Sequence, residues 1–127
     1  FSQAVLEHVE DLQSVYRTIH SWLKPKGYSS NQIDFKSHGF SNEWNGHWTY
    51  SSLFWKLTIG RRPWTFINRE PCSSHKIKIK NAGFKIINEL LFKSKSRIKR
   101  KNLAKDFKNI SEDDLIISGA FFQMIKE

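Results

Sequence analysis

Apolar residues at helical spacing mark the most regular segment of the sequence, residues 12–23. They recur three or four positions apart, as on the buried face of a helix: Leu12, Val15, Tyr16, Ile19 and Leu23. Asp11 is placed to cap the amino end of this helix, and Pro25 and Gly27 are placed to end it. The pattern therefore predicts a helix over residues 12–23.

Three other segments have the composition of strands. In residues 28–35, Ile33 and Phe35 flank Asp34, which predicts a short strand that ends near Asp34. Residues 84–92 are apolar, with Ile86, Ile87, Leu90 and Leu91, and residues 115–125 are almost continuously apolar. Such runs are typical of strands buried on both faces, so we expect both of them to lie in the interior of a sheet.

The aromatic-rich region of about residues 36–73 has no single period. Residues 36–50 are predicted to form a long loop, and long ordered loops are often functional. A Ser or Thr at positions 49–52 can cap a short helix that stops at Gly60. Residues 61–73 contain two prolines, so they are expected to be irregular.

Residues 75–80 carry two conflicting signals. The alternation of Lys and Ile over residues 76–80 indicates a strand. Ser73 or Ser74 before the segment and Gly83 after it are typical of the two ends of a helix. The local pattern leaves both structures open.

The composition is that of a folded domain, because 39% of the 127 residues are hydrophobic, 14% are aromatic and 26% are charged. Even residues 115–125 are much shorter than the roughly 20 apolar residues that span a bilayer, and no export signal is visible. We therefore expect no membrane partner. The single cysteine, Cys72, can form no internal disulfide, which favours a reducing, cytoplasmic setting. Because the chain opens on the apolar Phe1 and not on Met, we expect it to begin partway through a larger protein.

The net charge of +9 comes largely from one segment, residues 93–108, in which Asp106 is the only acidic residue. A basic surface attracts a phosphate backbone without sequence preference, which makes a nucleic-acid partner one interpretation. A solvated surface segment, in a sequence whose Lys, Ile and Asn content reflects codon usage, is the simpler one.

The opening of the chain resembles a segment of the class I S-adenosylmethionine-dependent methyltransferases. In that family the fourth strand ends in a motif like S-x-x-V-L-E-H-V-x-D, and here the run is Ser2-Gln3-Ala4-Val5-Leu6-Glu7-His8-Val9-Glu10-Asp11. A helix follows in both, and then a motif like L-K-P-G-G, which here is Leu23-Lys24-Pro25-Lys26-Gly27. Lys26 replaces the first glycine of that motif.

The resemblance continues along the chain. Ile33-Asp34-Phe35-Lys36-Ser37-His38 is similar to the h-D-x-x-x-H motif at the end of the fifth strand, and Ile67-Asn68-Arg69 is similar to an N-R motif before the next helix. Residues 75–84 match H-x-x-h-x-x-x-A-G-F, a helix that leads into the sixth strand, which favours a helix here. Residues 84–92 and 115–125 would be the sixth and seventh strands, the last one antiparallel.

The fold class that the resemblance implies is α/β, a partial Rossmann-like methyltransferase sheet of strands 4 to 7 with flanking helices. Residues 1–127 would form the C-terminal part of one methyltransferase domain, with an aromatic-rich insertion at about residues 36–73. The family holds its cofactor with a glycine-rich turn, and the six glycines here form no such cluster. We therefore expect this chain alone to bind S-adenosylmethionine poorly or not at all, and to be inactive alone.

The resemblance also assigns the cofactor side of the site. Ser2, Gln3 and Ala4 would lie at the mouth of the fourth strand, near the methionine part of S-adenosylmethionine, and Glu7 and His8 would follow in a turn. Some relatives hold a divalent metal with an acidic residue and a histidine at this turn. One Glu and one His are too few ligands, and Ala4 offers no oxygen donor, so we predict no metal site.

His38 is the expected general base, because an imidazole with a pKa near 6.5 suits proton removal at neutral pH. It lies just beyond the strand that carries Asp34, which is expected to contact the substrate. Four more residues complete the expected substrate side: Trp44, Trp48, Asn68 and Arg69.

Each of these assignments has a structural alternative. The tryptophans can wall an apolar pocket, or they can form a small satellite core, which we favour for Trp55. Asn68 and Arg69 can hold a polar or anionic group of the substrate, or belong to a surface ion pair.

The predicted function is methyl transfer from S-adenosylmethionine to a small molecule. The transfer is an in-line displacement, so the enzyme mainly aligns the two reactants and excludes water. Two alternatives stay open: an RNA methyltransferase that uses residues 93–108, and a non-catalytic basic binding module. The oligomeric state is not predicted.

Overall fold

The computed structural model of the chain describes residues 1–59 and 66–127 and is an α/β structure with a four-stranded sheet. The strands are β1 (Ser2–Gln3), β2 (Tyr28–Asp34), β3 (Phe84–Lys93) and β4 (Ile117–Lys126). The helices are α1 (Leu12–Trp22), α2 (Ser52–Leu57) and α3 (Cys72–Asn81), with short 3-10 turns that include η1 (Leu6–His8) and η2 (Gly46–Thr49). None of the helices in the described ranges is long and apolar enough to cross a membrane.

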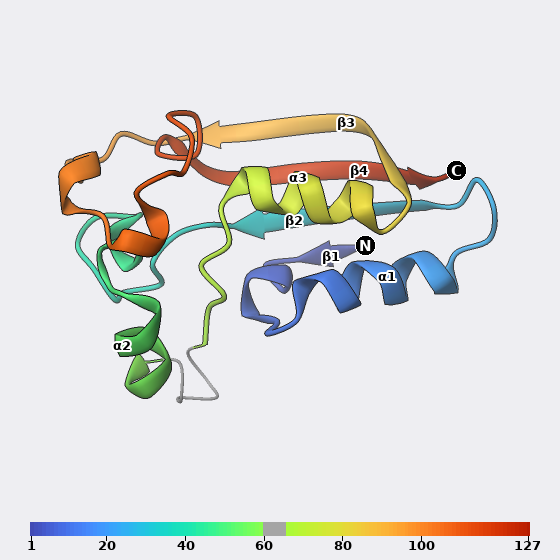
Figure 1. Ribbon diagram of the computed structural model, residues 1–127. Coiled ribbons are helices and arrows are strands. Elements are labelled where there is room, and N and C mark those ends of the chain that lie inside the picture. Colours follow the sequence, from blue (N-terminus) through green and yellow to red (C-terminus); the bar gives the residue numbers. More distant parts are fainter. Residues whose placement is uncertain (60–65) are drawn as a thin grey trace.

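The sheet is mixed, and its strand order is β1-β2-β4-β3. β1 runs parallel to β2, whereas β4 is antiparallel to both β2 and β3. The predicted antiparallel last strand is therefore confirmed. Because β4 alone is reversed, β1, β2 and β3 all end on the same side of the sheet, where β4 begins (Figure 1). We call this side the carboxyl edge, to distinguish it from the edge strands.

Two helices lie along the sheet, as Figure 1 shows for α1 and α3. The predicted helix over residues 12–23 is confirmed as α1, in which Leu12 and Tyr16 are buried. The carboxylate of Asp11 caps it by accepting from the Ser14 backbone N–H at 3.0 Å. In the turn that follows, Lys26 has a φ of 64°, a conformation that favours glycine, so the chain tolerates lysine there under strain.

The conflict over residues 75–80 is settled in favour of a helix, α3. Cys72, His75 and Ile79 are buried on one side of it, at helical spacing, while Ile77 is 60% exposed. Gly83 follows with a φ of 91°, the left-handed conformation that commonly ends a helix. The helix begins one residue earlier than the proposed serine caps, and the Ser73 backbone N–H donates to the Asp114 carboxylate at 2.9 Å instead.

The prediction that both apolar strands are buried on two faces is wrong for β3. Leu90 is 58% exposed and Phe92 is 47% exposed. β3 pairs only with β4 and therefore lies at an edge of the sheet, whereas β4 has a partner on each side. On one face of β4, Ala120, Phe122 and Met124 are fully buried, but Phe121 and Ile125 on the other face are partly exposed, so the prediction holds for one face of β4. β3 is an edge strand and carries Lys85, Asn88 and Glu89, whereas β4 lies between two strands and carries no charge before Lys126, and both differences favour the deeper burial of β4.

A second compact region lies beyond the carboxyl ends of β2 and β3 (Figure 1). We call it the distal lobe; it comprises residues 36–59, 66–71 and 94–116. Ser51 is the residue that caps α2, and α2 ends at Leu57, before the predicted stop. That stop, Gly60, and residues 61–65 lie outside the described residues, and residues 66–71 have no regular structure, as expected for this stretch.

Candidate functional site

The edge of the sheet where β1 and β2 end forms a hollow of about 350 Å³. Its walls include Gln3 and Ala4 at the end of β1, Asp34 at the end of β2, and Ser118 and Gly119 at the start of β4. In open α/β sheets, ligands bind outside the carboxyl ends of parallel strands. Two residues expected on the cofactor side and one expected on the substrate side therefore line the same hollow.

Ser2 and Asp34, both predicted site residues, make local contacts at this edge. The Ser2 hydroxyl donates to the Asn31 side-chain oxygen at 2.8 Å, which ties β1 to β2. One oxygen of the Asp34 carboxylate accepts from the Lys36 backbone N–H at 3.0 Å and so supports the turn after β2. Asp34 is partly exposed, and it also lines a second, much smaller cavity of about 10 Å³ against Glu7.

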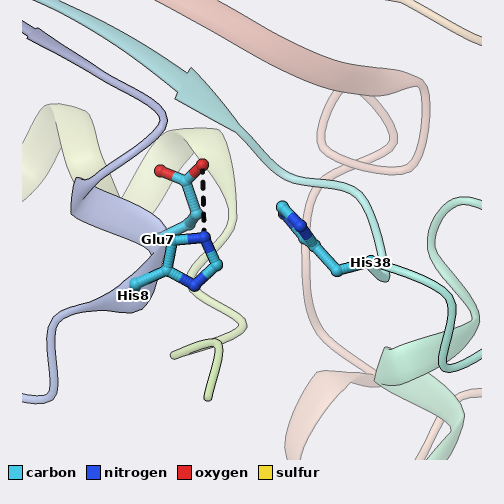
Figure 2. A group of neighbouring side chains, drawn as sticks. All are labelled: Glu7, His8 and His38. Atoms are coloured by element: carbon cyan, nitrogen blue, oxygen red, sulfur yellow. Dashed lines mark ion pairs between the residues drawn. The ribbon is translucent and has the colours of Figure 1, made fainter. Parts of the chain in front are cut away.

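Glu7, His8 and His38 come together beside this edge (Figure 2). Glu7 and His8 lie in the turn η1 after β1, and His38 lies in the turn after β2. Each side chain offers one nitrogen or oxygen atom, and these three atoms lie within 4.8 Å of one another. The rings of His8 and His38 meet edge to face, with their centroids 5.0 Å apart.

Glu7 is the buried member of this cluster, with 4% of its surface exposed. Neither oxygen of its carboxylate has a hydrogen-bond partner among the residues that the structure describes. The Nε2 atom of His8 lies 4.0 Å from Glu7 Oε1, a contact that is an ion pair only when the imidazole is protonated. Burial raises the pKa of Glu7. The nearby backbone N–H groups of Glu7 and Asp34 and the charges of His8 and His38 oppose that shift, although neither N–H forms a hydrogen bond with the carboxylate. A buried carboxylate without donors indicates that this end of the structure is not optimised for stability alone.

The orientation of His8 is fixed by a backbone carbonyl. Its Nδ1 atom lies 2.7 Å from the Phe66 carbonyl oxygen. Since a carbonyl only accepts, Nδ1 carries the proton in this bond, and in the neutral ring Nε2 then carries the lone pair that faces Glu7.

Asn68 holds the turn that carries Glu7 and His8. Its side-chain amide donates to the Leu6 carbonyl at 2.8 Å and to the Val9 carbonyl at 3.0 Å. Its backbone N–H donates to the Glu7 carbonyl at 2.8 Å. Through these bonds Asn68 acts as a positioning residue, since it shapes the turn from both sides.

The backbone is strained around the cluster. Four residues other than glycine have positive φ in the described ranges, and three of them are near this edge: Ala4 and His38 at 50° and Arg69 at 61°. A left-handed conformation costs about 1–2 kcal/mol per residue without glycine. Such strain is concentrated at functional sites in many proteins, where the surrounding structure holds it.

The tryptophans of the distal lobe form a satellite core. Trp48 is fully buried, and its indole N–H donates to the Arg69 carbonyl at 2.9 Å. Trp44 packs edge-on against Trp48 at 5.7 Å between ring centroids, and also against the main core. Trp55 is 4% exposed, which confirms the satellite core that we favoured for it. None of these three lines the hollow at the end of β1 and β2.

Arg69 is the cation at the centre of this lobe. Its side chain is buried, and its guanidinium donates to three oxygens of the lobe: the His47 carbonyl at 3.1 Å, the Tyr50 carbonyl at 2.7 Å and the Ser52 hydroxyl at 3.3 Å. It also lies over the rings of Trp55 and Phe107, at 4.6 and 4.8 Å from their centroids. These contacts join α2 to the segment before β4, so Arg69 stabilises the lobe.

The basic segment of residues 93–108 is partly cross-linked to itself. The Arg100 guanidinium donates to the Lys108 and Ile110 carbonyls at 2.6 and 2.8 Å. The Lys108 ammonium donates to the Arg100 and Lys101 carbonyls at 3.3 and 2.7 Å. Two of the basic side chains of this segment therefore hold the loop, while Lys93, Lys95, Lys99, Lys101 and Lys105 are exposed.

Sequence reasoning missed His47 and the grouping of His38 with the turn after β1. His47 is buried in the lobe and lines the small cavity beside Glu7. Burial, with the nearby charges of Arg69 and His38, lowers its pKa to about 3, so it is neutral. No local signal marks His47. The grouping of His38 with Glu7 follows from the fact that β1 and β2 are adjacent and parallel, since their carboxyl ends then meet.

Comparison with known proteins adds no family to this description. No protein-family model matches the chain, and no curated protein matches its sequence. The likeness to class I methyltransferases rests on the motifs quoted above.

Proposed function

We propose that the chain forms the acceptor side of an S-adenosylmethionine-dependent methyltransferase that acts on a small molecule. The observation that carries this proposal is the hollow of about 350 Å³ at the carboxyl ends of β1 and β2. Residues of two separate motifs line it, Gln3 and Ala4 from one and Asp34 from the other. Its volume lies within the usual range for small-molecule sites, about 300–1,000 Å³.

The residues present fit one side of such a cofactor. Gln3 and Ala4 would contact its methionine part at the mouth of β1, and Glu7 and His8 would shape the turn beside it. When bound, S-adenosylmethionine supplies an electrophilic methyl group. The described residues contain no glycine-rich turn to hold the remainder, so we expect weak binding, or none, by this chain alone.

On the acceptor side, Asp34 would orient the substrate and His38 would accept the proton that the substrate oxygen or nitrogen loses. Asp34 is the last residue of β2, and His38 lies in the turn that follows it. The internal contacts of Trp48, Asn68 and Arg69 support a smaller role for them than direct contact with substrate. They would keep the turn and the lobe in place.

A small acceptor is favoured over RNA because Arg100 and Lys108, two of the basic side chains in residues 93–108, bond to the loop itself. The cytoplasmic setting remains part of the proposal. Cys72 is a free thiol, and burial raises its pKa to about 12, which keeps it unreactive in a reducing compartment.

The test is a labelled-methyl transfer assay on the natural protein with small hydroxyl and amine acceptors, together with calorimetry of S-adenosylmethionine binding. Gln3→Trp fills the hollow from an exposed strand position and is expected to abolish transfer. Lys85→Trp, at an exposed position of β3 outside the hollow, is the matched control. Absence of cofactor binding by the natural protein, or equal activity of Gln3→Trp and the control, would overturn the proposal.

A further inference from the structure

We propose that Glu7, His8 and His38 bind a divalent transition-metal ion, with Zn²⁺ the best matched. This inference goes beyond methyl transfer and does not depend on it. It rests on three observations: the convergence of three ligand atoms within 4.8 Å, the unpartnered buried carboxylate of Glu7, and the fixed orientation of His8.

The donor set selects the class of metal. Two imidazoles and one carboxylate suit Zn²⁺ and other transition ions, whereas Mg²⁺ and Ca²⁺ prefer oxygen ligands throughout. Three protein ligands with an open position are the arrangement of catalytic zinc sites. The sequence alone offered only Glu7 and His8 at this turn, and the third ligand, His38, comes from the neighbouring strand.

The ligand atoms are near the spacing that zinc requires. Bonds of about 2.0–2.2 Å place tetrahedral ligand atoms roughly 3–3.5 Å apart. The Nε2 atom of His8 is 4.0 Å from Glu7 Oε1, and all three ligand atoms lie within 4.8 Å. Closing that gap needs small shifts that keep the hydrogen bond between His8 and the Phe66 carbonyl, and the side chains of His8 and His38 are exposed.

The carboxylate of Glu7 supplies the electrostatic reason for a cation. A buried ionised carboxylate without hydrogen bonds is strongly disfavoured, unless a positive charge accompanies it. Among the described residues, no Lys or Arg forms an ion pair with Glu7, and the only charged partner is His8 at 4.0 Å. A bound divalent ion would satisfy the oxygen that these residues leave unpartnered.

His8 already has the second hydrogen bond that metal-binding histidines usually make. Its Nδ1–H donates a hydrogen bond to the Phe66 carbonyl. The Nε2 atom, on the side of Glu7, then keeps a lone pair that can bind a metal ion. Asn68 fixes the same turn from the other side through the Leu6 and Val9 carbonyls. These bonds preorganise two of the three ligands before any ion arrives.

The site would change the role of His38. With an ion bound, the His38 lone pair is a ligand and cannot also accept a proton. The metal would lower the pKa of an acceptor hydroxyl in the open position, so that its proton could pass to solvent water. Asp34 lines both the hollow and the small cavity against Glu7, so the ion would lie next to the proposed acceptor site.

The experiment is a Zn²⁺ titration of the full chain after chelator treatment, in competition with a chromophoric chelator and without cofactor or acceptor. We expect one ion per chain, and Co²⁺ in place of Zn²⁺ should give the visible absorption of a low-symmetry, nitrogen- and oxygen-ligated site. Glu7→Gln and His38→Ala should each weaken binding by at least about tenfold. His20→Ala removes a histidine of α1 outside the cluster and should leave the affinity unchanged.

Folding of each variant is checked by circular dichroism, and Glu7→Gln keeps the shape of the side chain. The metal site would be overturned if the chain failed to bind one Zn²⁺ at micromolar concentrations of free Zn²⁺, or if His38→Ala left the binding intact. Neither result bears on methyl transfer, which is assayed separately. Conversely, a zinc-binding chain from a protein that never binds S-adenosylmethionine would sustain this inference and overturn the proposed function.

Discussion

The sheet with its two helices and the distal lobe are built on different principles. The main core is a continuous apolar cluster in which Tyr16 and His75 are the chief polar contact, with the Tyr16 hydroxyl 2.9 Å from His75 Nδ1. The lobe is organised around a buried cation, Arg69, and a buried neutral imidazole, His47. Polar burial and strained backbone gather where the lobe meets the sheet edge, and there the candidate site lies.

The largest effect we expect is acid destabilisation through one histidine in each region. Burial, the largest cause, lowers the pKa of His47 and of His75 from 6.5 to about 3. The unfolded chain takes up protons on both imidazoles below about pH 6.5, but the folded chain does not until about pH 3. The free energy of unfolding should therefore fall as the pH drops through that window, and about 1.4 kcal/mol corresponds to each pKa unit.

Urea unfolding at about pH 7 and about pH 4 measures this loss. The variants His47→Gln and His75→Gln separate the two regions, since each should remove one histidine's part of the pH dependence. Stability that changes equally with pH in both variants and in the parent chain would contradict this explanation.

The next effect compares the two apolar strands. Phe122 of β4 is fully buried, so Phe122→Ala should lower the free energy of unfolding by about 3–5 kcal/mol. Phe92 of β3 is 47% exposed, and Phe92→Ala should cost no more than about 1 kcal/mol. Urea denaturation of the pair measures the difference, and similar losses would mean that β3 is covered in solution.

A smaller effect tests the centre of the lobe. Arg69→Ala removes the guanidinium donor from the His47 and Tyr50 carbonyls, of which the His47 carbonyl keeps the Tyr50 backbone N–H at 3.4 Å. It also removes the guanidinium from two aromatic faces, and the whole change should cost roughly 2–4 kcal/mol. Arg97→Ala is the control, because the Arg97 side chain is 95% exposed and should change stability by less than about 0.5 kcal/mol. Denaturation followed by tryptophan fluorescence reports on the lobe directly.

The smallest effect has the opposite sign. Because burial raises the pKa of Glu7, the metal-free protein loses stability as the pH rises from below the ordinary carboxyl pKa through the raised one. Glu7→Gln removes that loss, so the metal-free variant should be slightly more stable than the parent at about pH 7 and not at about pH 4. Thermal unfolding of chelator-treated protein checks the sign, and a less stable variant at neutral pH would show that the carboxylate has a donor in solution.

The sequence predicts the helices and strands better than it predicts how deeply each one is buried in the fold. The period of α1 and the cap at Asp11 are local, and both are present in the structure. The two apolar strands differ locally, because β3 carries Lys85, Asn88 and Glu89. Their different burial also depends on the strand order, which no single run encodes. For α3 the alternation of Lys and Ile was misleading, and the flanking residues carried the information.

The same limit applies to the candidate site. Gln3, Ala4 and Asp34 were placed at strand ends by motif, and the structure brings them to one hollow. Arg69 and Trp48 have the chemistry of ligand-binding residues, yet their partners come from segments distant in the sequence and are internal. The third candidate ligand, His38, can be placed beside Glu7 and His8 only when the pairing of β1 with β2 is known.

The reversal of β4 has a consequence for how this hollow can diversify. Residues 94–116 leave the sheet at the end of β3 and return at the start of β4. Hydrogen bonds join the two ends of this segment where it meets the sheet, and we call these bonds the clasp. There the Ser94 backbone N–H donates to the Ile116 carbonyl at 2.8 Å, and the Ser94 and Ser118 hydroxyls are 2.8 Å apart. Ser94 and Ser118 also line the hollow. Beyond the clasp, Arg100, Phe107 and Asp114 hold the segment to itself, to Arg69 and to α3, but its exposed lysines can change without disturbing the strands, so selection can alter the charge beside the hollow while the pairing of the strands stays as it is.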